Sequence, residues 1–195
     1  MTFKFVNQPL LSGRFEPEGI YLHAPLPGPL QVVQRWGDHA EFYGRYTYYG
    51  IPLKGHPGVD IATPVGTQVL AVDKGRVVEL SFDLLGFGRY LKLEHAWGES
   101  LYAHLAETLV DAGQSVARGE RIALSGDNEG QLSPHLHFGL RIRPFQRFDG
   151  WGGFTDPLPF FSVADLDLPD EEIPDAVPTF PPPPLVEERE GVRRP

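Results

Sequence analysis

The chain has 195 residues, a formal net charge of −9 and no cysteine. Any metal site must therefore use His, Asp or Glu, and no disulfide indicates an oxidising compartment. The acidity is uneven, because residues 165–195 hold nine Asp or Glu against three Arg. The remainder is near neutral, which excludes a nucleic-acid-binding face and a basic anchor for a membrane, so no nucleic-acid partner is predicted.

The N-terminal segment, residues 1–29, is rich in Pro and Gly. This composition predicts an irregular N-terminal arm packed on the main domain. The first nine residues contain no long apolar run and no small-residue cleavage site, so they do not predict a signal peptide. No stretch of the sequence approaches the length of a transmembrane helix.

Residues 30–162 have the pattern of one domain built from short strands and turns. The chain has 22 Gly and 20 Pro, and its aromatic content of 12% favours strands. No amphipathic stretch reaches ten residues at helical spacing, and a short turn at 105–109 is the one helix-like piece. These features predict an all-β, mostly antiparallel fold. Strands are expected at residues 30–37, 68–72, 76–82, 89–95, 100–104, 115–116, 121–125 and 136–143.

The segment from Glu41 to Tyr49 is rich in aromatic residues. It is interpreted either as a loop or hairpin whose rings pack on the domain, or as one wall of a groove that receives substrate. Both interpretations stay open, because aromatic rings serve either purpose.

The C-terminal segment, residues 163–195, is acidic and proline-rich, with four consecutive prolines at 181–184. Such a composition buries too little apolar surface to offset the loss of chain entropy. It predicts a disordered tail or an extended polyproline II segment, with a docking partner for this tail as one expected use.

His135 and His137 alternate with apolar residues in the stretch Ser-Pro-His-Leu-His-Phe-Gly. Successive side chains of a strand point to opposite faces, so both imidazoles are predicted to share one face. Two imidazoles on one face suit a metal site or acid–base chemistry better than a packed core. Either role needs further residues from elsewhere in the chain.

Residues that could complete such a site lie in the stretch His-Pro-Gly-Val-Asp, which begins at His56 and ends at Asp60. Together with His137 they supply two imidazoles and one carboxylate, a common donor set for catalytic zinc. Pro57 and Gly58 make a helix unlikely there and predict a tight turn that leads into a strand. We therefore expect one Zn²⁺ per chain, held by these three side chains.

His104 and His135 remain for proton transfer beside the metal. Histidine titrates near neutrality, so one ring could take a proton and the other could stabilise a developing oxyanion or return a proton to the leaving amine. The sequence leaves the two roles unassigned. Structural roles are expected for the other histidines, His23, His39 and His95.

Five pieces of the sequence carry a resemblance to a known family, and they are residues 55–67, 69–78, 101–105, 113–123 and 133–138. They resemble the lysostaphin/LytM-type zinc metallopeptidases, which cut peptide crosslinks or stem peptides in bacterial peptidoglycan. The resemblance implies a compact antiparallel β domain with a groove over one sheet, a peptidoglycan peptide as substrate, and action at the cell wall by a secreted, periplasmic or phage-delivered protein. It also implies the same metal ligands and catalytic histidines as above.

Two other classes of function stay open at this point. One is a non-catalytic zinc-binding module, such as a regulator of cell-wall enzymes or a component of a phage-tail-like assembly. The other is a phosphocarrier-like β domain that uses His104 and His135. Zinc dependence separates the phosphocarrier from a peptidase, because the phosphocarrier has no need of Asp60.

Overall fold

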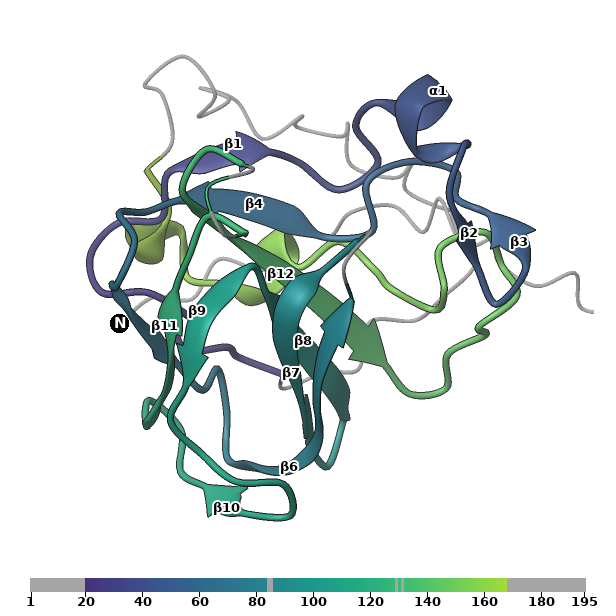
Figure 1. Cartoon of the computed structure of the whole chain (residues 1–195). Coiled ribbons are helices and arrows are strands. Elements are labelled where there is room, and N and C mark those ends of the chain that lie inside the picture. Colours follow the sequence, from purple (N-terminus) through teal and green to yellow (C-terminus); the bar gives the residue numbers. More distant parts are fainter. Residues whose placement is uncertain (1–19, 84–85, 129, 131, 168–195) are drawn as a thin grey trace, which may run out of the picture.

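The computed structural model describes residues 20–83, 86–128, 130 and 132–167. Within these ranges the strands form three sheets with the orders β1-β4-β12-β8-β7-β6-β10, β5-β11-β9 and β2-β3 (Figure 1). Every pair of neighbouring strands is antiparallel. The predicted all-β, mostly antiparallel fold class is therefore confirmed.

The elements follow one another at short intervals, as the frequent turn residues predict. Their bounds are β1 Val32–Gln34, α1 Ala40–Tyr43, β2 Thr47–Tyr48, β3 Ile51–Pro52, β4 Val59–Ala62, β5 Gln68–Leu70, β6 Gly75–Asp83, β7 Gly88–Glu94, β8 Gly98–Ala103, β9 Leu105–Thr108, β10 Ser115–Val116, β11 Arg121–Ser125 and β12 His135–Ile142, followed by the 3₁₀ turns η1 Leu158–Phe160 and η2 Val163–Asp165.

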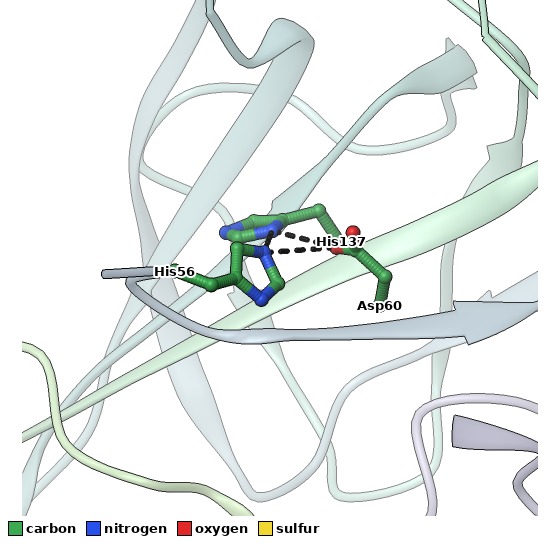
Figure 2. A group of neighbouring side chains, drawn as sticks. All are labelled: His56, Asp60 and His137. Carbon is green, nitrogen blue, oxygen red and sulfur yellow. Dashed lines mark hydrogen bonds and ion pairs between the residues drawn. The ribbon is translucent and has the colours of Figure 1, made fainter. Parts of the chain in front are cut away.

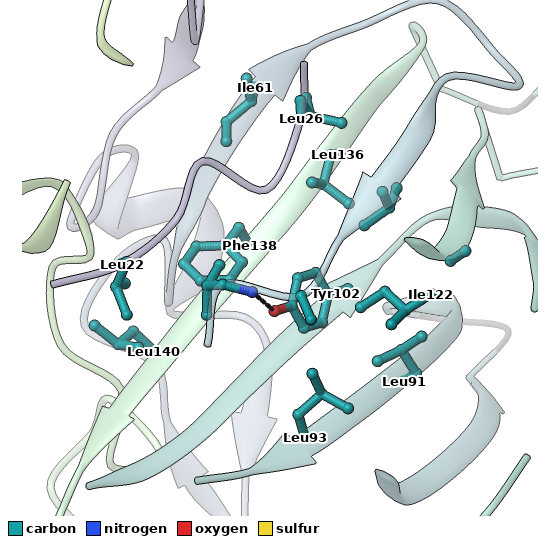
Figure 3. Packing of buried hydrophobic residues seen from close by; sticks show 14 of the residues in the cluster. Leu22, Leu26, Ile61, Leu91, Leu93, Tyr102, Ile122, Leu136, Phe138 and Leu140 are labelled. Carbon is teal, nitrogen blue, oxygen red and sulfur yellow. Dashed lines mark hydrogen bonds between the residues drawn. The ribbon is translucent and has the colours of Figure 1, made fainter. Parts of the chain in front are cut away.

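Strand β12 lies between β4 and β8 in the large sheet. Its alternation divides its side chains between the two faces, and Leu136, Phe138 and Leu140 enter the main hydrophobic core with no exposed surface. The core joins side chains from the large sheet and from the three-stranded sheet, including Tyr102 and Ile122 (Figure 3). This packing holds the opposite face of β12, which carries the two histidines, in one fixed position.

The hydroxyl of Tyr102 is a polar group within this part of the core. It accepts a hydrogen bond from the backbone N–H of Val72 at 2.9 Å (Figure 3). It also lies 3.2 Å from Ser100 Oγ. The side chains of Tyr102 and Ser100 are fully buried, so water cannot replace the contacts of the Tyr102 hydroxyl. The bond to Val72 ties the turn after β5 to β8.

Replacing Tyr102 by Phe is expected to destabilise the fold by about 1–3 kcal/mol, because the buried N–H of Val72 loses its acceptor. Urea unfolding followed by circular dichroism measures this loss. Tyr46→Phe is the matched control, since Tyr46 is 43% exposed. Equal unfolding midpoints for Tyr102→Phe and the wild type would show that the hydroxyl contributes nothing.

One local expectation is contradicted by the structure. The predicted short turn at 105–109 is wrong, because Leu105–Thr108 forms β9 and pairs with β11. Pairing and the burial of Leu105 decide the conformation there over local preference. The aromatic segment 41–49 contains most of helix α1 and the first strand of the β2-β3 hairpin.

The described parts of the predicted arm and tail both contact the domain. Leu22 and Leu26 are buried in the main core. Leu30 donates its N–H to the carbonyl of Asp165 and accepts from the N–H of Asp167. The rest of both segments, residues 1–19 and 168–195, lies outside the described residues. Among the described helices, none has the length and apolar character needed to span a bilayer.

Candidate active site

Two neighbouring strands bring the first candidate ligands together. β4 and β12 pair so that Asp60 lies directly opposite His137. His56 reaches the same place through the turn that precedes β4. A Cβ on Gly58 in that turn would lie 2.4 Å from the carbonyl oxygen of Phe138 and 2.9 Å from His137 Nε2, so only glycine lets the turn approach β12 this closely.

His56, Asp60 and His137 form a compact group of donor atoms (Figure 2). His56 Nε2 lies 2.9 Å from His137 Nδ1 and 3.2 Å from Asp60 Oδ1. His137 Nδ1 lies 2.9 Å from the same carboxylate oxygen. For bonds of about 2.0–2.1 Å to a tetrahedral zinc ion, neighbouring ligand atoms stand about 3.3 Å apart. The observed spacing is close to that value.

Hydrogen bonding also prepares His56 to act as a ligand. Its Nδ1 lies 3.1 Å from the backbone carbonyl of Arg35, so Nδ1 must carry the proton that this acceptor receives. In the neutral ring, Nε2 then presents a lone pair to the carboxylate of Asp60, an arrangement that a cation stabilises. His137 directs Nδ1 to the same carboxylate oxygen, so its neutral ring would bind a metal ion through Nδ1 and carry its proton on the buried Nε2. These residues fit a bound metal ion.

The electrostatics of the group agree with this donor set. Burial alone raises the pKa of the Asp60 carboxyl, but hydrogen bonds and charge interactions with His137 and His56 outweigh burial and hold that pKa well below its usual range. Burial lowers the pKa of His137. Burial, together with the nearby charge of Asp60, raises the pKa of Tyr43 to about 12. The carboxylate is therefore ionised and the His137 ring neutral near pH 7, which is the form that binds a metal.

His104 and His135 lie next to this group. Their ring centroids are 4.7 Å apart, and the His104 ring is 6.0 Å from that of His137. His135 donates from Nδ1 to the carbonyl of Ser133 at 2.6 Å, which leaves a lone pair on Nε2, 3.7 Å from Asp60 Oδ2. His104 occupies the bend between β8 and β9 with a φ of 58°, and its Nδ1 is buried without a described partner.

Burial, together with the nearby His137 and His135, lowers the pKa of His104 to about 3. In metal-free protein, stability is therefore expected to fall as the pH falls from about 6.5 toward 3. In that range the unfolded chain takes up a proton on this residue that the folded chain does not, so acid favours unfolding.

Urea midpoints measured with a chelator between pH 7.5 and 4.5 test this expectation. His104→Asn should flatten the pH slope by at most about 1.4 kcal/mol per pH unit, the effect of one proton. Asn suits the positive φ at this position. Equal slopes for the variant and the wild type would contradict the expectation.

The other histidines lie apart from the group. His95 contacts the Lys74 carbonyl through Nδ1 at 2.9 Å and Ser100 Oγ through Nε2 at 2.7 Å, and it stacks on Trp97. His39 precedes α1, and His23 Nδ1 lies 2.7 Å from the carbonyl of Ala24. Their contacts fit the structural roles expected for them.

Sequence reasoning did not single out Arg141, which alternation places on the His137 face of β12. Its side chain is 1% exposed, its Nη1 donates to Glu99 Oε2 at 2.8 Å, and its Nε donates to the carbonyl of Gly152 at 2.9 Å. The guanidinium lies 4.1 Å from the ring centroid of Phe154. Arg141 thus fastens the segment after β12 against the sheet. Continuing the alternation two residues beyond Gly139 would have pointed to it.

Tyr43 bears on whether the aromatic rings of residues 41–49 pack on the domain or line a groove that receives substrate. Its ring lies 5.2 Å from that of His56, and its hydroxyl accepts a hydrogen bond from Gln34 Nε2 at 2.8 Å. At least one ring of the segment therefore borders the candidate metal group. Others, such as Tyr48 against Phe154 at 5.9 Å, pack on the domain.

Comparison with known proteins finds a family match over the part of the chain that holds the candidate site. Residues 54–149, which include all five candidate residues, match the family model described as Peptidase family M23. The chain is 39% identical over 89 residues to the peptidoglycan DD-endopeptidase ShyB of Vibrio cholerae, covering 45% of this chain and 21% of that protein. It spans between 19% and 36% of the length of the curated relatives it matches.

Two solved structures are also similar. The catalytic domain of the antimicrobial peptidase lysostaphin from Staphylococcus simulans is 30% identical, with 62% of this chain and 96% of that domain covered and a TM-score of 0.49. A zinc-containing peptidase from Vibrio cholerae is 27% identical, with 74% of this chain and 39% of that chain covered and a TM-score of 0.51. The chain is also 32% identical over 136 residues to lysostaphin of Staphylococcus staphylolyticus, covering 68% of this chain and 27% of that protein. From the family-model match and this identity, the chain belongs to peptidase family M23, the lysostaphin/LytM-type metallopeptidases.

Proposed function

We propose that this chain is a zinc-dependent endopeptidase that hydrolyses peptide bonds in the crosslinks or stem peptides of bacterial peptidoglycan. The observation that carries the proposal is the convergence of three donor atoms within 2.9–3.2 Å of one another, next to two further imidazoles. His56, Asp60 and His137 would hold one ion. A relative named as a peptidoglycan DD-endopeptidase supports the substrate class.

A zinc ion in this site would polarise the scissile carbonyl and lower the pKa of a water molecule to about 7. The protein supplies the orientation. The carbonyl of Arg35 fixes the His56 tautomer, and the pairing of β4 with β12 fixes Asp60 against His137. Burial of all three side chains keeps bulk water from competing for their lone pairs.

The hydrogen bonds of the two remaining imidazoles suggest how they divide the proton transfers. In His135 the bond from Nδ1 to Ser133 leaves Nε2 free to accept a proton from the attacking water. Burial keeps His104 neutral, so one ring nitrogen carries a hydrogen that it can donate to the oxyanion that develops on the substrate. We propose His135 as the general base and His104 as the oxyanion donor.

Two measurements test the proposal. Metal analysis of protein purified without chelators should give one zinc per chain. Digestion of defined peptidoglycans, read by mass spectrometry, should then release fragments at one type of peptide bond. Zinc without cleavage of any peptidoglycan would instead favour the non-catalytic binding module, and absence of zinc would contradict both.

The domain limits belong to the same proposal. Residues 30–162 would form the peptidase domain, with an arm before it and the acidic tail after it. The expected place of action is the cell wall, where the substrate lies. Digestion by a variant that ends at residue 167 would show whether residues 168–195 are needed for cleavage.

A further inference from the structure

A pocket of about 210 Å³ lies beside His104, between the β6-β7 hairpin and the segment that follows β11. None of the five candidate site residues lines it. The pocket is lined by an exposed phenylalanine, an arginine, an aspartate and part of β9. Its lining residues include Phe82, Arg89, Leu105, Gly126, Asp127 and Asn128.

The pocket presents two opposite charges that do not pair with each other. Arg89 is exposed, and within the described ranges its guanidinium has no ion pair or hydrogen bond. Asp127 accepts a backbone hydrogen bond from Gly130 through Oδ1 at 2.9 Å, which leaves Oδ2 for another donor. A purely anionic ligand would be repelled by Asp127 and a purely cationic one by Arg89. A ligand that carries both charges meets neither penalty.

The pocket is also close to the proposed chemistry. Leu105, in its wall, directly follows His104. Gly88 has a φ of +57°, and a Cβ on it would lie 2.3 Å from Asn128 Oδ1 and 3.7 Å from His104 Nδ1. Gly88 therefore lies close to both the His104 ring and Asn128, which lines the pocket. The proposal below requires that one peptide fill this pocket and place its scissile bond at the metal group.

We propose that this pocket selects a substrate residue whose side chain ends in a free α-amino acid group, with an ammonium and a carboxylate on one carbon. The carboxylate would meet the guanidinium of Arg89, and the ammonium would meet Asp127 Oδ2. The methylene stem would lie along Phe82 and Leu105. This inference rests on the proposed function. In peptidoglycan the free end of a diaminopimelyl side chain has this chemistry, whereas a lysyl side chain has the ammonium alone.

The first test compares two crosslinked stem-peptide dimers, one with the free diaminopimelyl carboxylate and one with that group as its carboxamide. Arg89→Gln is expected to lower kcat/KM about tenfold or more on the acid, mainly through KM, and to change it little on the carboxamide. Arg89→Lys should restore part of the loss. Arg121→Gln, another exposed arginine, is the matched control. An equal loss on both dimers would overturn the proposal.

The second test does not depend on cleavage. A stem tripeptide that ends in diaminopimelate is titrated into ¹⁵N-labelled, metal-loaded protein, and shifts are expected at the amides of Gly126 and Asp127. Arg89→Gln should remove them, and Asp127→Asn, which keeps an oxygen for Gly130, should weaken binding only while the side-chain amine is free. Unchanged binding in both variants would refute the proposal that this pocket binds the free end of the diaminopimelyl side chain. Failure of the wild type to cleave any peptidoglycan would refute the proposed function. The titration would still show whether the pocket binds the diaminopimelyl side chain, because it measures binding without cleavage.

Discussion

Replacing His56 by Ala is expected to abolish metal binding and, with it, hydrolysis of peptidoglycan. In the proposed site His56 supplies one of the three donors found among the described residues, and its Nε2 lies within 3.2 Å of both of the others. Changes to outer residues that merely orient a ligand already cost about 10–100-fold in affinity or activity. Loss of a ligand should therefore cost more than about 100-fold.

Metal analysis and thermal unfolding check this result together. Zinc should raise the melting temperature of the wild type, because it binds the folded chain, and should leave that of His56→Ala unchanged. His39→Asn is the control, since His39 is exposed and has a positive φ that Asn tolerates. A His56→Ala protein that keeps one tightly bound zinc would refute the ligand assignment.

Replacing either proposed proton-transfer residue should separate catalysis from metal binding. His104→Asn and His135→Gln are expected to keep zinc and to lose about 10²–10⁴ in kcat, the range typical of a general acid or base. Both rings lie beside the three donor atoms but are not part of that group. Replacing either ring should therefore leave the proposed metal ligands in place. Zinc content and kcat, measured on the same samples, provide the comparison.

The pH profile and a double variant distinguish the two roles further. If His135 is the base, His135→Gln should remove the acid limb of the kcat profile, and His104→Asn should lower the plateau and keep the limb. The double variant should lose less than the product of the single losses, since the two rings act in one step. Loss of zinc in either single variant would indicate that the replaced histidine is a metal ligand.

The sequence predicted the strand-rich class because its evidence is local. The alternation of His135, Leu136, His137 and Phe138 has the period of a strand, and the structure has β12 there, with the apolar pair in the core. The prediction failed at 105–109, where no local pattern records that β11 lies alongside. Leu105–Thr108 is a strand because β11 supplies its hydrogen-bond partners.

For the candidate ligands too, the sequence determines one part of the site and the tertiary structure the rest. Their residue types and the spacing from His56 to Asp60 can be read from the sequence, and so can the resemblance to a family. Their convergence cannot, because His56 and His137 stand 81 residues apart and meet only through the pairing of β4 with β12. A shift of one residue in that pairing would turn His137 to the core face.

By itself, then, the sequence determined the fold class, the donor types and the shared face of the two histidines on β12, since each depends on neighbours a few residues away. Only the tertiary structure decided the donor distances, the neutral state of the buried His104 and the burial of Arg141. It alone also placed Arg89 and Asp127 around one pocket. Those properties depend on strand register and on desolvation by residues distant in the chain, and periodicity carries no information about either.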